Sequence, residues 1–194
     1  MSRAGRAGPG SGVTFEARLP APWGAASFRP LQVRADLDLV HGWMRAPHVA
    51  PWWELDVPRA ELAAYLERAV ADDHQQVLIG SVGGRPVSYW ELYWAARDPL
   101  AAWYQADPHD QGVHLLIGPR SLTGRGLGTA LLGAVAAWQL GREPATRRVV
   151  AEPDVRNIAS LRAFERCGFR RVAELDLPSK HAALMVRERA AVAP

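Results

Sequence analysis

The spacing of hydrophobic and polar positions along the chain predicts alternating strands and helices. Two segments carry apolar residues at i, i+3, i+4 and i+7, which is the period of one buried helix face. The first begins near Pro58, and the second follows a glycine-rich segment and ends near Gly141. Between them, the extended segments 75–82 and 86–94 flank a glycine pair and predict a β-hairpin.

The rest of the pattern completes a mixed series of elements. Residues 28–33 predict a first strand, and Asp36 is expected to cap a helix that runs to about Arg45. A loop rich in Asp and Pro then leads from residue 95 into a strand that begins at His114. The last elements expected are a strand at 148–151, a helix capped by Asn157, and strands at 169–175 and 182–187. The predicted order is β-α-α-β-β-β-α-β-α-β-β.

The length and composition indicate one domain behind a short tail. The chain has 194 residues, 48% of them hydrophobic, which is enough for one compact core. We expect a disordered tail at 1–24 and the domain at 25–190. The opening sequence MSRAGRAGPGSG lacks the apolar centre of a signal peptide, and no stretch is long enough to cross a membrane. We therefore expect no membrane partner.

The charge balance and the cysteine count exclude further classes. Twenty-three basic against 20 acidic side chains give a net charge of only +3, and the arginines are scattered, which argues against a nucleic-acid partner. Cys167 is the only cysteine, so neither an intrachain disulfide nor a cysteine-based metal cluster can form. We expect no metal and interpret Cys167 as a small buried hydrophobe, which suits a reducing cytoplasm.

The segment HLLIGPRSLTGRGLG, residues 114–128, joins a strand to a glycine-rich turn and a helix. Unpaired N–H groups of such a turn converge on one point, where the helix dipole also favours negative charge. Glycines let an anion approach the backbone, and Arg125 adds charge at the rim. The segment has neither the Lys-Ser/Thr of a P-loop nor G-x-G-x-x-G spacing, so a nucleoside triphosphate is not expected. A phosphate site and a plain strand-to-helix turn are the two interpretations.

Two segments resemble a known family. The sequence GRGLGTALL, followed later by NIASLRAFERCGF, resembles the adjacent signature segments of the GCN5-related N-acetyltransferases (GNAT), which bind acyl-coenzyme A. The resemblance covers about residues 28–189. It implies an α/β (α+β) fold, with a single mixed, mostly antiparallel sheet and helices on both faces. It also implies acetyl-CoA or another acyl-CoA as co-substrate.

The resemblance also assigns the cofactor site. Backbone amides of the turn would hold the pyrophosphate, and the later segment would line the pantetheine arm and the thiol. The residues implied are Leu116, Ile117, Gly118, Arg125, Gly126, Leu127, Gly128, Thr129, Asn157, Ser160 and Phe164. Two positions depart from the family: Thr123 stands where Gln or Arg is usual, and Phe164 replaces the tyrosine often credited with protonating the leaving thiolate.

A narrower resemblance concerns the acceptor. The segments APHVAPWWEL and WELYWAARDPLAAWYQADPHDQGVHLLIGP are similar to siderophore-biosynthesis N-acyltransferases, which acylate lysine, hydroxylysine or N-hydroxylated diamines. This resemblance implies that His114 and Asp154 are catalytic. A primary amine with a pKa near 10.4 needs a base at pH 7, because removing its proton costs on the order of 4–5 kcal/mol. We expect His114 to be that base, and Asp154 either to orient the imidazole ring or to take the proton through water.

Aromatic and acidic residues near His114 are the candidates for the acceptor pocket. They are His48, Trp52, Trp53, Glu91, Trp94, Tyr104 and Asp110, where the carboxylates would meet a distal ammonium. Two alternatives stay open: an aminoglycoside 6′-N-acetyltransferase, whose layout is similar, and a non-catalytic acyl-CoA-binding module. The expected partner is a small amine or hydroxylamine. The sequence is compatible with a monomer or a homodimer, and with an acetyl, succinyl, malonyl or longer acyl group.

Overall fold

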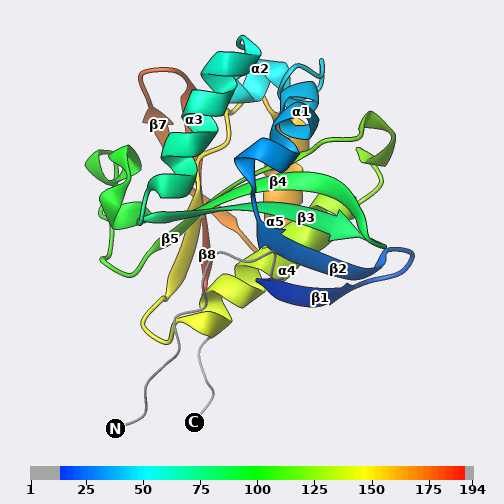
Figure 1. Ribbon diagram of the computed structural model, residues 1–194. Coiled ribbons are helices and arrows are strands. Elements are labelled where there is room, and N and C mark those ends of the chain that lie inside the picture. The colour runs from blue at the N-terminus through cyan, green and yellow to red at the C-terminus, as the bar shows by residue number, and fades with distance from the viewer. Residues whose placement is uncertain (1–13, 191–194) are drawn as a thin grey trace, which may run out of the picture.

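The computed structural model describes residues 14–190, which form one eight-stranded sheet with helices on both faces (Figure 1). The strands are β1 (Phe15–Leu19), β2 (Gly24–Pro30), β3 (Gln75–Val82), β4 (Arg85–Trp94), β5 (Gln111–Ile117), β6 (Arg148–Ala151), β7 (Arg170–Asp176) and β8 (His181–Glu188). The helices are α1 (Val33–Met44), α2 (Ala50–Trp53), α3 (Arg59–Ala71), α4 (Leu127–Arg142) and α5 (Ile158–Arg166), with short 3-10 turns η1 (Ala95–Arg97), η2 (Pro99–Ala102) and η3 (Arg120–Leu122).

The sheet opens between two of its central strands. Its order is β1-β2-β3-β4-β5-β6-β8-β7, and every neighbouring pair is antiparallel except β5 and β6. These two parallel strands pair only at Gln111 with Val149 and at Gly112 with Val150. Because β5 continues to Ile117 without further pairing to β6, the strands separate and leave a wedge in the middle of the sheet. This wedge positions the site described below.

Apolar side chains fill both faces of the sheet. Helices α1 and α3 bury Leu37, Val40, Leu62 and Leu66 against residues of β3, β4 and β5 on one face. On the other face α4 buries an apolar stripe that includes Leu131 and Val135, and α5 adds Phe164. The prediction of a single mixed, mostly antiparallel sheet covered on both faces is therefore confirmed.

The N-terminal part of the domain starts earlier than expected. Residues 15–24 lie within the predicted tail, yet β1 and the first residue of β2 form an antiparallel hairpin there. Phe15 stacks on Phe28 and on Trp138 of α4, with ring centroids 4.3 and 4.4 Å apart, so burial of this aromatic ring explains the extra strand. The rest of the predicted tail, residues 1–13, lies outside the described residues.

Two further predictions differ in detail, and one helix was not predicted. Asp36 lies inside the first turn of α1, where its carboxylate accepts the Gln32 N–H at 2.8 Å and pairs with Arg29 at 2.6 Å. It therefore stabilises the helix start without being its N-cap. Helix α2 was not predicted, because four residues are too few for a periodic pattern. Strand β5 begins at Gln111, which makes His114 its central residue instead of its first.

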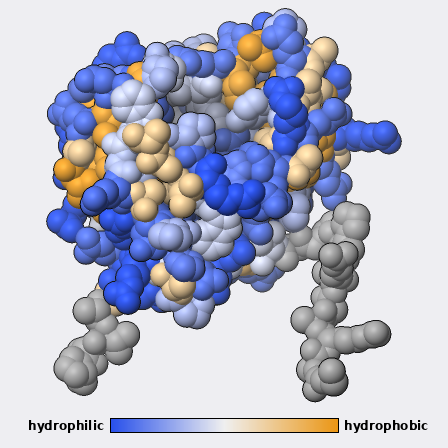
Figure 2. Space-filling view, turned by 90° about the vertical axis from the view of Figure 1, so that its left-hand side faces the viewer, coloured by the Kyte–Doolittle hydropathy of each residue, from blue (hydrophilic) through white to orange (hydrophobic). Residues whose placement is uncertain are grey.

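The lengths of the helices and the distribution of hydrophobic residues on the surface were compared with what a membrane-spanning helix or a continuous apolar face would need. In the described part of the chain, no helix combines the length and the apolar character needed to cross a membrane. On the face that Figure 2 presents, hydrophobic residues lie in separate groups among hydrophilic ones.

Candidate active site

The glycine-rich turn at residues 124–128, called the glycine turn below, places free backbone N–H donors at one end of the wedge. Gly124 and Gly126 adopt φ values of +71° and +85°, a region that favours glycine. Gly126 is the N-cap of α4, and no side chain caps this helix among the described residues. The first bond within the helix runs from the Ala130 N–H to the Gly126 carbonyl at 3.0 Å. The N–H groups before Ala130 are therefore available to an anion at the positive end of the helix dipole.

A cavity of about 360 Å³ extends from this turn along the wedge. It lies between β5 on one side and α4 and α5 on the other. Its lining contains eight of the predicted cofactor residues: Leu116, Ile117, Gly126, Gly128, Thr129, Asn157, Ser160 and Phe164. Asn157 has a local task as well, because its side chain accepts the Ser160 N–H at 3.1 Å and caps α5, as predicted.

Three predicted cofactor residues do not line this cavity. Leu127 is fully buried in the core, and Arg125 is exposed, with its guanidinium 5.8 Å from the centre of the Trp23 ring. Gly118 packs against Trp43 so closely that a Cβ at this position would lie 2.1 Å from the ring. The need for glycine at 118 is thus explained by packing.

Strand β5 directs alternate backbone groups into the wedge. The Gly118 N–H is donated to Val87 of β4 at 2.9 Å, so alternation along the strand turns the backbone groups of Leu115 and Ile117 away from β4. The Ile117 carbonyl confirms this direction, because it accepts a hydrogen bond from His48 Nε2 at 3.0 Å. The Leu115 and Ile117 N–H groups are therefore the donors that face the cavity.

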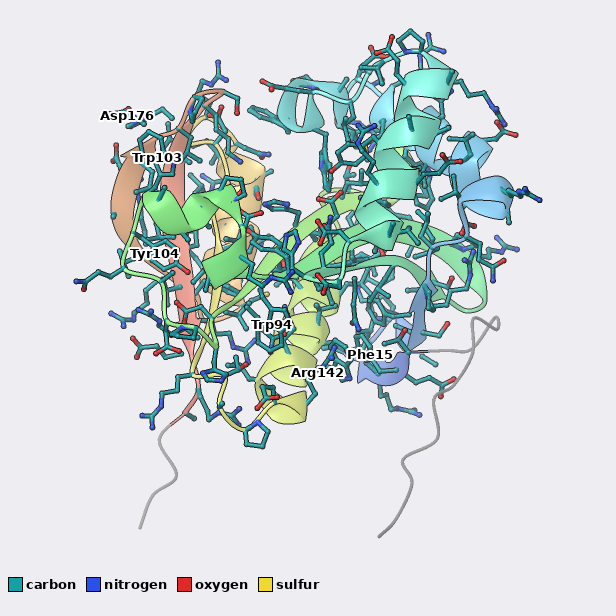
Figure 3. All side chains as sticks on the ribbon, turned by 60° about the vertical axis from the view of Figure 1, so that its left-hand side comes forward. Phe15, Trp94, Trp103, Tyr104, Arg142 and Asp176 are labelled. Atoms are coloured by element: carbon teal, nitrogen blue, oxygen red, sulfur yellow. The ribbon has the colours of Figure 1, made fainter. Side chains whose placement is uncertain are left out.

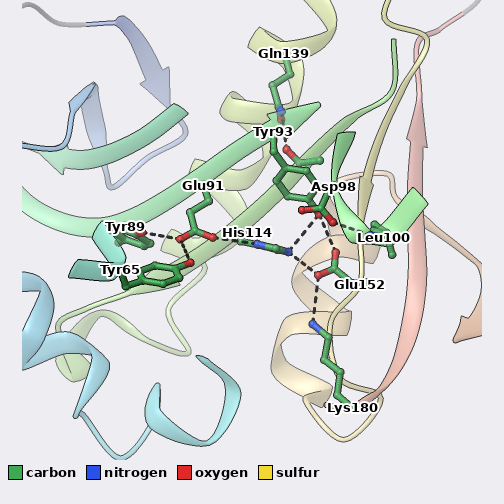
Figure 4. A network of polar contacts seen from close by, with 11 residues as sticks. Tyr65, Tyr89, Glu91, Tyr93, Asp98, Leu100, His114, Gln139, Glu152 and Lys180 are labelled. Atoms are coloured by element: carbon green, nitrogen blue, oxygen red, sulfur yellow. Dashed lines mark hydrogen bonds and ion pairs between the residues drawn. The ribbon is translucent and has the colours of Figure 1, made fainter. Parts of the chain in front are cut away.

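His114 sits between two carboxylates (Figure 4). Its Nδ1 lies 3.3 Å from Glu91 Oε2, and its Nε2 lies 2.5 Å from Glu152 Oε1. Glu91 is directly opposite His114 in the register of β4 with β5, and Glu152 directly follows β6. The parallel start of β5 and β6 thus brings the end of β6 beside the middle of β5.

Tyrosines and one lysine complete this network. The hydroxyls of Tyr65 and Tyr89 each donate to Glu91 Oε1 at 2.7 Å, and Tyr93 donates to Glu152 Oε2 at 3.0 Å. Lys180 Nζ lies 3.3 Å from Glu152 Oε1. Burial raises the pKa values of all three tyrosine hydroxyls, so they act as hydrogen-bond donors at neutral pH.

The carboxylates determine the charge of His114. Burial by itself lowers the pKa of the imidazole, but the charges and hydrogen bonds of Glu152 and Glu91 outweigh it and raise the pKa to about 10. Burial likewise opposes ionisation of Glu152, yet His114 and Lys180 lower the pKa of this carboxyl to about 2. The pair is therefore an imidazolium and a carboxylate at pH 7. In this state His114 is not the free base that the sequence analysis expected.

Asp154 occupies a different environment. Both of its carboxylate oxygens face the Arg156 guanidinium, with Oδ2 at 2.7 Å from Nη2, and Oδ1 also accepts the Arg156 N–H at 2.7 Å. These contacts lower the pKa of the carboxyl. Asp154 and His114 line the same cavity, but Glu152 is the residue that bonds the imidazole.

The predicted acceptor residues divide into two groups. His48, Trp52, Trp53 and Glu91 line the connected cavities, and Trp53 stands edge-on to the His114 ring, with centroids 6.2 Å apart. Trp94, Tyr104 and Asp110 lie elsewhere. Trp94 lines a separate cavity with Arg142 (Figure 3), and Tyr104 packs against the apolar cluster that includes Leu100.

Asp110 is 1% exposed and fully engaged in a structural contact. It accepts two hydrogen bonds from Arg148, at 2.9 and 2.6 Å, and one from Tyr104 at 3.1 Å. Asp110 therefore does not line the cavity at His114, and its hydrogen bond with Tyr104 keeps the Tyr104 hydroxyl away from that cavity.

Sequence reasoning missed Glu152, Lys180, Tyr65 and Tyr93. Two signals were available. Glu152 directly follows the strand that runs parallel to the histidine strand, and Lys180 is the only lysine in the sequence. Cys167 caps the end of α5, where its Sγ donates to the Thr129 carbonyl at 3.0 Å and burial raises its pKa to about 11. Among residues 14–190, no group of three His, Cys, Asp or Glu side chains is arranged to hold a metal ion.

Comparison with known proteins identifies the class of protein. Residues 32–177 match the family model described as an acetyltransferase (GNAT) domain. The chain therefore belongs to the GNAT acetyltransferase family and is an acyl-CoA-dependent N-acyltransferase. The glycine turn, its free N–H groups and the wedge beside β5 fit acyl-CoA as the co-substrate.

Two named relatives are similar to this chain over most of its length. The chain is 37% identical to lysine N-acyltransferase MbtK of Mycolicibacterium paratuberculosis over 87% of its own length and 78% of that protein. It is 36% identical to an N(6)-hydroxylysine O-acetyltransferase of Escherichia coli over 84% of its length and 52% of that relative.

Solved structures show the same fold. An uncharacterized protein from Bacillus halodurans is 41% identical with a TM-score of 0.85, and the match covers 90% of this chain and 89% of that one. The aminoglycoside acetyltransferase AAC(6')-Ib in complex with coenzyme A is 26% identical with a TM-score of 0.77, over 84% of this chain and 95% of that one.

Proposed function

We propose that this enzyme transfers an acyl group from acyl-CoA to the nitrogen of lysine or of an N-hydroxylated lysine or diamine, in the synthesis of a hydroxamate siderophore. The observation that carries the proposal is the junction of two cavities at the wedge. The cavity at the glycine turn and the cavity at His114 share Trp52, Trp53, Leu115, Asn157, Ser160 and Phe164. A thioester held along the first would therefore face an acceptor held in the second.

The backbone would bind and orient the acyl donor. The N–H groups at the start of α4 face the position for the pyrophosphate, and Gly124 and Gly126 keep side chains away from it. When bound, acyl-CoA supplies an activated thioester carbonyl. The Leu115 and Ile117 N–H groups, which face the wedge, are suited to stabilise the oxyanion that forms on this carbonyl during acyl transfer.

His114 would move the protons. It carries a proton in the resting site and lines the same cavity as Phe164, which has no hydroxyl to offer the departing sulfur. We assign it two steps: the imidazolium gives its proton to the coenzyme A sulfur, and the ring then accepts the proton that the acceptor nitrogen loses. Glu152 and Glu91 hold the ring in place through both steps. Asp154, bound to Arg156, shapes the wall of the pocket.

The acceptor pocket has the features that a long polar aliphatic chain needs. Trp52 and Trp53 form its apolar wall, and polar groups of Tyr65, Ser179 and Arg156 lie along the remainder. The relatives named above, a lysine N-acyltransferase and an N(6)-hydroxylysine O-acetyltransferase, support this class of acceptor. We place the reaction in the cytoplasm, where a free thiol such as Cys167 stays reduced.

Release of coenzyme A from acetyl-CoA, followed by thiol titration, tests this function. The acceptors are lysine, N6-hydroxylysine, N-hydroxycadaverine and kanamycin. We expect kcat/KM for the best of the first three to exceed that for kanamycin at least tenfold, which is about 1.4 kcal/mol of transition-state binding. A preference for kanamycin would instead assign aminoglycoside acetylation. Binding of coenzyme A without its release in the presence of any of these four acceptors would overturn the proposed acceptor class.

A further inference from the structure

Four charged groups meet at the reacting end of the acceptor pocket. Glu91 and Glu152 are 5% and 6% exposed, and His114 lies between them. The fourth group is Lys180, whose side chain is 26% exposed and lines both cavities that contain His114. It comes from the turn before β8, whereas the other three come from β4, β5 and the end of β6.

The four charges cancel within the protein itself. Glu152 Oε1 contacts both cations, His114 at 2.5 Å and Lys180 at 3.3 Å, while Glu91 faces His114 and two tyrosine hydroxyls. The neighbouring Asp154 and Arg156 cancel each other in the same way. Glu54 adds a negative charge at the mouth of the pocket, but it is exposed, so water screens it. Asp98 is a further half-buried carboxylate near His114 and Glu152, but it accepts the Leu100 N–H and lines neither cavity that contains His114. The lining of these cavities therefore offers no uncompensated buried carboxylate to an incoming ammonium.

The hydrogen bonds of His114 point to the same conclusion. Each ring nitrogen faces a carboxylate oxygen, and an ionised carboxylate can only accept hydrogen bonds. The Tyr93 hydroxyl also lies 3.3 Å from Nε2, but it donates its proton to Glu152 Oε2. Both nitrogens are therefore donors and the ring already carries its proton. A protonated amine acceptor would have to lose a proton before attack. The imidazole in this network is already protonated, and the two carboxylates already accept from His114, Lys180 and tyrosine hydroxyls.

A neutral hydroxylamine avoids both obstacles. Its nitrogen bonds to the thioester carbonyl carbon, the carbon–sulfur bond breaks, and the electron pair of that bond leaves with sulfur. The sulfur gains one proton and the nitrogen loses one, so the protein ends the cycle with the proton it began with. With an ammonium acceptor, one additional proton must leave the site in every turnover.

We propose that Lys180, by neutralising Glu152, makes this site select a neutral N-hydroxylamine acceptor over a protonated primary amine. Lys180 is then a specificity-determining residue. This inference rests on the proposed function, because the acceptor must first be an amine or hydroxylamine of the proposed class. Burying an ammonium beside a neutral cluster brings its desolvation penalty without a compensating charge. Without the Lys180 charge, Glu152 would be only partly neutralised, and it could then pair with that ammonium.

The test compares two acceptors that differ by one hydroxyl group. The ratio of kcat/KM for N6-hydroxylysine to that for lysine is measured at pH 7 by thiol release, for the wild type, Lys180→Gln and Lys180→Arg. We expect the wild type to favour N6-hydroxylysine at least tenfold. Lys180→Gln should lower the ratio at least tenfold, and Lys180→Arg, which keeps the cation, should keep it within about threefold. Arg59→Gln, which removes an exposed cation on α3, is the matched control and should leave the ratio unchanged.

The outcomes separate this inference from the proposed function. A wild type that favours lysine, or a Lys180→Gln ratio equal to that of the wild type, overturns the role of Lys180 while the N-acyltransferase function stands. If Lys180→Gln is too unstable to assay, a loss of selectivity in Lys180→Arg overturns the role equally, because that variant retains the charge. Absence of turnover with both acceptors in the wild type overturns the proposed function itself.

Discussion

Replacing Glu152 by Gln tests the ion pair on which the interpretation of the site depends. The substitution keeps the shape of the side chain and removes its charge 2.5 Å from the His114 ring. Breaking a fully buried pair by removing one partner costs about 3–5 kcal/mol. Here the His114 side chain is 32% exposed and Glu91 remains on the other side of the ring, so solvent and the second carboxylate reduce the loss. We expect the free energy of unfolding at pH 7 to fall by about 2 kcal/mol.

The same substitution must change the titration of His114. Because one pKa unit corresponds to about 1.4 kcal/mol, the pKa of His114 should fall from about 10 to roughly 8–9 in Glu152→Gln. The titration is followed by NMR of the ring protons, with His114→Gln to assign the signal. Asp154→Asn is the matched control, because its carboxylate contacts Arg156 instead of His114. A wild-type His114 that titrates near 6.5, or an unchanged titration in Glu152→Gln, would show that Glu152 does not hold His114 as an imidazolium.

The pH dependence of stability follows from these pKa values. The folded-state pKa of His114 lies above its ordinary value of 6.5, so its stabilising contribution is complete below 6.5 and is lost as the pH rises through about 10. The folded-state pKa of Glu152 lies below its ordinary value of 4.5, so its contribution is complete above 4.5 and is lost as the pH falls towards about 2. Urea unfolding should therefore show the pair's full contribution to the free energy of unfolding between about pH 4.5 and 6.5. In Glu152→Gln, the free energy of unfolding should depend less on pH both below and above this range.

Two further substitutions test the donor site and the assignment of Asp110. Gly126→Ala forces a side chain into a left-handed conformation that costs about 1 kcal/mol and moves the N–H groups of the turn, so KM for acetyl-CoA should rise several-fold, whereas Gly141→Ala inside α4 should not raise it. An unchanged KM in Gly126→Ala would remove the turn from the donor site. Asp110→Asn should lower the free energy of unfolding by about 2 kcal/mol, because it breaks the buried pair with Arg148, and leave KM for the acceptor unchanged. A higher acceptor KM at native stability would return Asp110 to the acceptor pocket.

Local patterns were sufficient to predict most of the fold. The hairpin 75–94 depends on a glycine pair between two extended segments, and α5 depends on the Asn157 cap, so both are determined within a few residues. Strand β1 was missed because its stability comes from Phe15 stacking on Phe28 and Trp138, which are distant in sequence. Local composition cannot reveal such a contact.

The site was predictable only in part for the same reason. His114 and the glycine turn lie within one short segment, and the sequence pattern identified both. Asp154 was assigned through the family resemblance, whereas the contact of Glu152 with His114 depends on where β6 ends relative to β5, which the sequence alone does not specify. Asp110 resembled an acceptor ligand by proximity to His114, but its partner Arg148 comes from another strand.

The role of His114 in proton transfer is tested most directly by measuring coenzyme A release from acetyl-CoA with N6-hydroxylysine, together with coenzyme A binding, for the wild type and His114→Gln. We expect turnover in the wild type and a loss of at least a hundredfold in kcat for His114→Gln, because general acid–base groups contribute about 10²–10⁴. Coenzyme A affinity should be retained. Equal turnover by the two proteins, with coenzyme A bound by both, would contradict the assignment of proton transfer to His114.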